Sequence, residues 1–108
     1  MTAPNSKEWE AFENSMPVGD VTLMVTGKVE TTNGRIIGVL TDREPQGFNP
    51  AILMLDLSLC EIAEDGTADV AFRPTKTYRK PVERGAIKTV QIMWAGRTVA
   101  EVPVKPIS

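Results

Sequence analysis

The sequence predicts a single all-β domain, an antiparallel two-sheet sandwich of about seven strands with a short N-terminal helix. Three observations support this fold class. Apolar and polar residues alternate with period two from residue 18 onward, turn-forming pairs separate the alternating stretches, and 108 residues leave room for one domain. The expected organisation is a helical segment over residues 1–17 and a sandwich of immunoglobulin-like proportions over residues 18–108. A small, partly open barrel built from the same hairpins is the alternative.

The N-terminal segment has the pattern of a short amphipathic helix. Asn5 and Glu8 have the spacing of a capping box, and Pro17 is placed to end the helix. An apolar stripe at helical spacing lies between them: Trp9, Phe12 and Met16. Because two helical turns are marginal alone in water, we expect this helix to dock on the sheet.

The next stretch is typical of a strand with one buried face. Its apolar residues alternate with polar ones: Val21, Leu23, Val25 and Val29. Asn33-Gly34 follows, a pair that favours the type I′ turn of a two-residue hairpin loop. That register places Val29 opposite Gly38. It also adds two apolar residues to the buried face: Ile36 and Leu40.

Residues 42–50 (DREPQGFNP) are expected to form a loop because they contain two prolines and one glycine. Pro45 and Pro50 stiffen the loop around Phe48. A rigid loop that presents an aromatic side chain is typical of binding modules on β scaffolds, which makes Phe48 a candidate binding residue. The alternative is that Phe48 folds back and closes the open end of the sandwich.

The most hydrophobic strand is expected over residues 51–62. One of its faces is made of leucines: Leu53, Leu55, Leu57 and Leu59. The other face is half apolar and includes Asp56, and we expect the N-terminal stripe or a partner subunit to cover it. Asp65-Gly66 predicts a second two-residue hairpin, with Leu59 opposite Phe72. The single cysteine, Cys60, is interpreted as a small packed hydrophobic residue.

Residues 86–94 and 98–104 predict a third hairpin. A three-residue loop, Ala95-Gly96-Arg97, pairs Ile92 with Ala100 and gathers the apolar residues on one face. A two-residue loop would scatter them over both faces. The gathered face consists of Val90, Ile92, Trp94, Ala100, Val102 and Val104. Met93 is expected to point outward, with Gln91 and Glu101.

Charge is segregated along the chain. Residues 1–72 carry four basic and twelve acidic groups, whereas residues 73–108 carry eight basic and two acidic groups, which together give the net charge of −2. Residues 75–80 are bracketed by prolines and rich in Lys and Arg, so we interpret them as a strand at the edge of a sheet. The basic residues and one tyrosine of this region are candidate binding residues: Arg73, Lys76, Tyr78, Arg79, Lys80 and Arg84.

Three interpretations of this basic segment are open. It is a solvated sheet edge, or a surface that meets the acidic part of a second copy, or a site for a polyanion such as nucleic acid. The pI of about 5.1 and the single aromatic residue in the segment argue against nucleic acid.

Catalytic and metal-binding chemistry finds little support in the sequence. The absence of His and the single Cys remove His-based triads and the common Cys- and His-rich metal sites. We therefore expect no enzymatic activity, no cofactor and no metal. No apolar run is long enough to span a membrane. The N-terminus lacks the apolar stretch of a secretory signal, and the single Cys fits a reducing compartment, so we expect a cytoplasmic protein.

The expected function is that of a non-enzymatic protein-binding module that acts through the 42–50 loop or the basic 73–84 edge segment. Its partner is another protein or a second copy of the chain. A self-assembling structural component is the alternative, and a polyanion or nucleic-acid binder is a weaker one.

Overall fold

The computed structural model describes residues 3–15, 20–61 and 68–107, and every regular element in them is a β-strand. The all-β prediction is therefore confirmed. The eight strands are β1 (Ser6–Asn14), β2 (Thr22–Thr31), β3 (Ile36–Asp42), β4 (Ile52–Glu61), β5 (Ala71–Pro74), β6 (Tyr78–Pro81), β7 (Thr89–Trp94) and β8 (Arg97–Ile107). In this part of the chain, no helix is long and apolar enough to cross a membrane.

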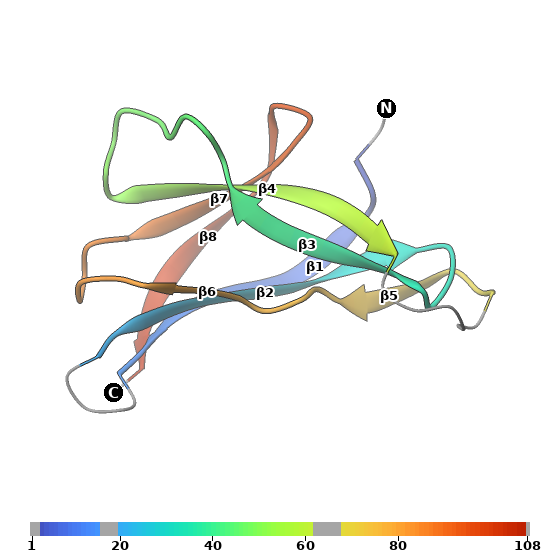
Figure 1. The fold of residues 1–108 in the computed structure, drawn as a ribbon, viewed down its shortest axis with the longest axis horizontal. Helices are drawn as coiled ribbons and strands as arrows, with labels where there is room; N and C mark the ends of the chain where they lie inside the picture. Colours follow the sequence, from blue (N-terminus) through green and yellow to red (C-terminus); the bar gives the residue numbers. More distant parts are fainter. Residues whose placement is uncertain (1–2, 16–19, 62–67, 108) are drawn as a thin grey trace.

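The strands form one mixed sheet that is nearly closed into a barrel (Figure 1). The order is β3-β4-β7-β8-β1-β2-β5, and β6 also pairs with β2. Neighbours are antiparallel except for β4 with β7 and β8 with β1, which are parallel. The sheet is not clearly divided into the two layers of the expected sandwich. The reason is that the long strand β8 pairs first with β7 and then with β1, and so joins both halves into one sheet.

The segment between β5 and β6 links the two ends of this sheet. Thr75 donates its backbone N–H to Gly27 O in β2 (2.8 Å), and its hydroxyl oxygen accepts the Gly27 N–H (3.2 Å). The next residue, Lys76, donates its N–H to Gly38 O in β3 (3.0 Å). Consecutive residues thus connect β3, the first strand of the order, with β2, on the edge of β2 where β5 and β6 pair. Only part of the edge strand expected over residues 75–80 is present, as β6 (Tyr78–Pro81), because Thr75 and Lys76 form this connection.

The core follows the alternation seen in the sequence. Three of the four leucines of β4 that were expected to share a face are buried, as are the apolar residues expected on one face of β2. The buried residues that form the core cluster are Ala11, Leu23, Val25, Val29, Leu40, Leu53, Leu55, Leu57, Val90, Ile92 and Val102. Each large apolar side chain buried in this way contributes about 1.5–3 kcal/mol to folding.

The expected N-terminal helix is wrong, because residues 6–14 form strand β1. Trp9 and Ala11 point toward the core at period two, and Glu8 has a φ of 55° at a bulge in the pairing with β2. As a strand, this segment has ladder partners on both sides, β2 and β8, which a two-turn helix would lack. Met16 lies outside the described residues.

The strand pairing predicted for the first two hairpins is also wrong, although the predicted buried faces are largely correct. Gly38 lies opposite Leu59 of β4 rather than Val29, and Phe72 lies opposite Glu30 of β2 rather than Leu59. Neither Asn33 nor Gly34 has the positive φ of a type I′ turn. The positive φ angles among the described residues are at Glu8, Gly85, Ala95 and Gly96. The Asp65-Gly66 turn lies outside the described residues. Period two determines which face is buried, but not which strand is the neighbour.

The third hairpin has the expected register in its central part. Ile92 pairs with Ala100 as expected, but the turn is the two-residue Ala95-Gly96, with φ angles of 50° and 82°. A bulge between Ile92 and Met93 absorbs the extra residue that a three-residue loop would have held. Met93, expected to point outward, is buried, although it does not belong to the core cluster.

Cys60 is exposed, contrary to the expectation that it packs in the core. The reason is that β4 extends past the end of its pairing with β7, which covers Ile52–Asp56 only. Beyond that point β4 has β3 as its ladder partner in the described part of the chain. Leu59 in the same stretch is 39% exposed, so the leucine face is buried only as far as Leu57.

Gly27 allows Trp9 to lie directly against β2, and this close approach generates a stability prediction. A Cβ at Gly27 would lie 2.2 Å from the Trp9 Cε3 atom, so the indole would have to move. We expect Gly27→Ala to lower the free energy of unfolding by about 1–3 kcal/mol in urea denaturation. Gly47→Ala is the matched control, because its Cβ would meet only the flexible Met54 Sδ (3.2 Å). Equal effects of both substitutions would contradict the expectation.

Candidate functional site

The loop between β3 and β4 is held firmly against β4. Arg43 donates its backbone N–H to Met54 O (3.0 Å). The Gln46 side-chain oxygen accepts the Met54 N–H (2.8 Å), and its amide nitrogen donates to Met54 O (2.9 Å) and to Arg43 O (2.6 Å). The Gln46 amide thus makes the hydrogen bonds that a neighbouring strand would make to β4.

The same loop covers the outward face of β4. Arg43 forms an ion pair with Asp56 (Nη1–Oδ1 3.0 Å), and Gly47 lies beside the Met54 side chain. The N-terminal stripe was expected to cover this face, and that expectation is wrong because Trp9 and Phe12 are part of β1. Asp56 therefore serves as an anchor for the loop.

Phe48 is the most exposed large apolar side chain among the described residues, with a relative exposure of 108%. The chain after it is fixed by Asn49, whose side-chain and backbone oxygens accept the N–H groups of Ala51 (3.0 Å) and Ile52 (3.1 Å). Phe48 does not fold back to close the end of the barrel, which was the alternative considered from the sequence. An aromatic ring is thus held in water on an anchored loop.

The turn between β7 and β8 lies beside this loop. A Cβ at Gly96 would be 3.9 Å from the Arg43 Nη2 atom, and Figure 1 shows both connections at the same end of the molecule. Ala95, Gly96 and Arg97 are exposed. We define the Phe48 surface as residues 43–50 together with this turn, residues 95–97. It combines an exposed aromatic ring with exposed polar and charged groups.

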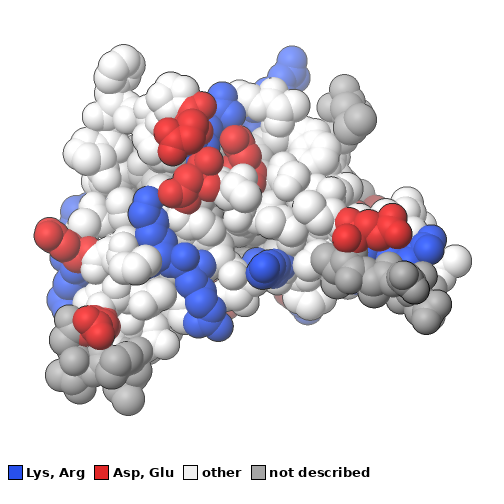
Figure 2. All heavy atoms as spheres, in the orientation of Figure 1, with Lys and Arg blue, Asp and Glu red and all other residues white. Residues whose placement is uncertain are grey.

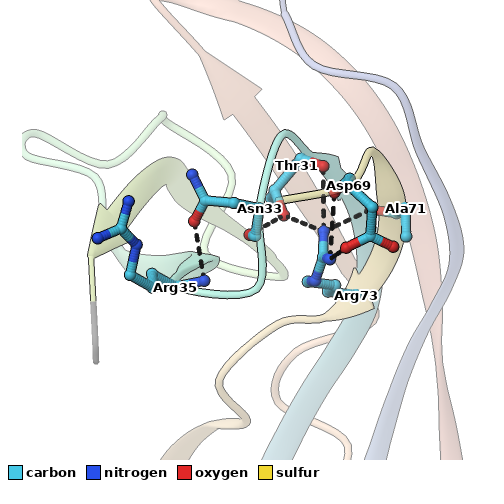
Figure 3. Close-up of polar contacts among 6 residues, drawn as sticks. All are labelled: Thr31, Asn33, Arg35, Asp69, Ala71 and Arg73. Carbon is cyan, nitrogen blue, oxygen red and sulfur yellow. Dashed lines mark hydrogen bonds and ion pairs between the residues drawn. The ribbon is translucent and has the colours of Figure 1, made fainter. Parts of the chain in front are cut away.

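Arg73, a predicted binding residue, forms its hydrogen bonds within the protein (Figure 3). Its guanidinium donates to the Thr31 hydroxyl (2.9 Å), to Thr31 O (3.1 Å) and to Ala71 O (3.4 Å). Its second nitrogen contacts Asp69 Oδ1 (2.8 Å) and Asp69 O (3.2 Å). The Thr31 hydroxyl also donates to Asn33 O (3.0 Å). Arg73 therefore ties the chain leading into β5 to the end of β2 and its following turn.

Tyr78 and Lys80 meet Asp42, the last residue of β3. The Tyr78 hydroxyl donates to Asp42 Oδ1, and Lys80 Nζ lies 3.2 Å from Asp42 Oδ2. Burial opposes ionisation of Asp42, but the hydrogen bonds and the Lys80 charge outweigh it and hold its pKa below the usual 3.8. Burial, together with the hydrogen bond to the carboxylate, raises the pKa of the Tyr78 phenol above its usual 10.0. This cluster reinforces the closure of the sheet between β6 and β3.

The remaining predicted residues of the basic segment are Lys76, Arg79 and Arg84, and all three are exposed. Arg79 contacts the Met24 sulfur through its guanidinium (3.7 Å). In Figure 2, a band of basic side chains crosses the face that carries β6, and acidic side chains lie next to it near the β3–β4 connection. The charges that are separated along the sequence are thus neighbours on this face, partly as ion pairs.

Two residues that the sequence analysis missed have defined roles. Gln46 anchors the loop, and Glu13 is a buried carboxylate on β1. Periodicity does not reveal the role of Gln46 because it lies in a loop, and Glu13 depends on Gly85, a partner 72 residues away. Within residues 3–15, 20–61 and 68–107, no group of three or more Cys, Asp or Glu side chains could hold a metal ion. Comparisons with protein-family models, curated proteins and solved structures find no match to this chain.

The Asp42 cluster predicts how stability depends on pH. The folded-state pKa of Tyr78 is raised, so its contribution is complete below pH 10 and is lost as the pH rises further. The pKa of Asp42 is lowered, so its contribution is present above pH 3.8 and is lost as the pH falls. We expect Tyr78→Phe to cost about 1 kcal/mol at pH 7 and to remove the alkaline component, as measured by urea unfolding. Tyr78 is the only tyrosine, so ultraviolet titration reports its ionisation directly. An ordinary titration midpoint would contradict this assignment.

The exposure of Phe48 predicts that it does not stabilise the fold. We expect Phe48→Ala to change the free energy of unfolding by less than about 0.5 kcal/mol. Leu55→Ala, on the strand that the loop contacts, is the comparison and should cost about 2–5 kcal/mol. Thermal or urea denaturation measures both. A loss of several kcal/mol for Phe48→Ala would mean that the ring is part of the core.

Proposed function

We propose that this protein is a non-enzymatic binding module that recognises another protein through the Phe48 surface. The observation that carries the proposal is the fully exposed ring of Phe48 on a loop that Gln46 and Arg43 anchor to β4. Burying an aromatic ring at an interface is a large source of binding energy. Because the loop is already ordered, little conformational entropy is lost when a partner covers it.

The contacts of the basic segment favour the loop over the 73–84 edge. Arg73, Tyr78 and Lys80 are engaged in hydrogen bonds or ion pairs that hold the sheet together. A partner that used these groups would have to compete with contacts inside the protein. By contrast, the Phe48 ring can be covered without breaking any of these contacts. Lys76, Arg79 and Arg84 could still steer an acidic partner, since exposed charges mainly raise association rates.

Photo-crosslinking tests the proposal directly. A photoreactive phenylalanine analogue, p-benzoylphenylalanine, is placed at position 48, and a matched probe is placed at exposed Arg79. In an extract of the source cells, we expect a discrete protein adduct from position 48 and not from position 79. Unlabelled wild-type protein should compete for the adduct, whereas Phe48→Ser should not. Gln46→Ala should compete less well, because the loop loses its anchor while the ring is retained.

The outcomes separate the possible partners. An adduct of twice the mass of this chain would assign the surface to self-association, the alternative considered from the sequence. Light scattering at low and high salt then checks whether the assembly depends on charge. Equal labelling from positions 48 and 79, or competition by Phe48→Ser, would overturn the proposal.

A further inference from the structure

Glu13 is the one buried side chain with a formal charge among the described residues, at 6% exposure. A carboxylate is rarely buried without a cationic partner, because removing the charge from water is costly. The ion pairs of the described residues are formed by other carboxylates: Glu8, Asp42, Asp56 and Asp69. The position of Glu13 therefore calls for an explanation beyond the packing of the fold.

One oxygen of Glu13 is occupied and the other is available. Oε2 accepts the backbone N–H of Gly85 (2.8 Å), and Gly85 has a φ of 72°, which favours glycine. Oε1 has no hydrogen-bond partner among the described residues and is not one of their fully buried unpartnered atoms, so it is accessible to solvent. An ionised carboxylate offers about four acceptor positions, so most of its capacity is unused.

Glu13 lines a cavity of about 430 Å³ between the end of β1, the β6–β7 connection and β8. The walls of this cavity are apolar, from Ile87, Val104 and Pro106. Arg84 and Lys88 line it as well, and both are exposed. We call this the Glu13 cavity. It combines a buried anion, an apolar wall and two cationic groups at its rim.

We propose that the Glu13 cavity binds a small zwitterion of the apolar α-amino acid type. The ligand's ammonium group donates to the free oxygen of Glu13, and its carboxylate is held by Arg84 and Lys88. Its apolar side chain contacts Ile87, Val104 and Pro106. A simple cation would satisfy Glu13 but would be repelled at the rim, and a simple anion would meet the buried carboxylate. A ligand that carries a positive and a negative group close together can pair with Glu13 and with the two basic residues at the same time.

The cavity volume is consistent with this class, since pockets for small molecules begin at about 300 Å³. The site shares no residue with the Phe48 surface, although the Lys88 N–H donates to the carbonyl oxygen of Ala51, which directly follows that surface (2.8 Å). The inference is therefore independent of the proposed protein-binding function, and either can fail without the other.

Titration with three related ligands tests the proposal on the intact chain. L-leucine has both charges, L-leucinamide lacks the carboxylate, and 4-methylpentanoate lacks the ammonium group. Binding is followed by ¹⁵N–¹H NMR, in which the Gly85 amide reports on Glu13 directly. We expect L-leucine to shift the Gly85 signal. Each analogue should bind with an affinity that is lower by a factor of about ten or more.

Two variants assign the contacts. Glu13→Gln keeps the shape of the side chain but removes its charge, and it should abolish binding of L-leucine and of L-leucinamide. Because a buried substitution can disturb folding, Arg84→Ala at an exposed position is the second variant. Arg84→Ala should lower the affinity for L-leucine but leave the lower affinity for L-leucinamide unchanged. Absence of L-leucine binding to the wild-type protein, or equal affinity for all three ligands, would overturn the proposal.

Discussion

The closure of the barrel depends on three hydrogen bonds that Thr75 and Lys76 make to β2 and β3, two of them between backbone groups and one to the Thr75 hydroxyl. Thr75 is bound to Gly27 through its N–H and through its hydroxyl, while Lys76 reaches Gly38 in the opposite strand. Both glycines permit close approach. A Cβ at Gly38 would lie 3.0–3.1 Å from the side chains of Thr75, Leu57 and Val29. Without this connection, the backbone groups of Gly27 and the carbonyl of Gly38 would lose these hydrogen-bond partners.

This closure explains why much of the basic segment is not available to a partner. Tyr78 and Lys80 follow directly after the connection and meet Asp42 at the end of β3. Arg73 precedes it and ties the chain to Thr31. The positive charges of this segment thus lie where the sheet closes, and their partners come from the acidic N-terminal part of the chain. Two of the basic residues after position 72, Arg73 and Lys80, thus form ion pairs with acidic residues that precede them in the sequence.

The two surfaces proposed for binding differ in their physical character. The Phe48 surface exposes an apolar ring on a loop that is anchored by side-chain to backbone hydrogen bonds. The Glu13 cavity instead holds a buried charge whose hydrogen-bonding capacity is mostly unused. The Phe48 surface suits a macromolecular partner that has a pocket for the ring. The second suits a small ligand that complements a few polar groups.

Four features follow from the sequence alone: the all-β class, the buried faces of β2 and β4 as far as Leu57, the loop between β3 and β4, and the central register of the β7–β8 hairpin. These features are local, because period-two alternation and turn chemistry act over a few residues. The tertiary structure, by contrast, sets which strands pair across the sheet. It turned residues 6–14 into a strand with two neighbours and placed β3 beside β4. It also buried Glu13 and left Phe48 and Cys60 in water. These outcomes depend on hydrogen bonds and packing between residues far apart in the chain, which no short-range pattern records.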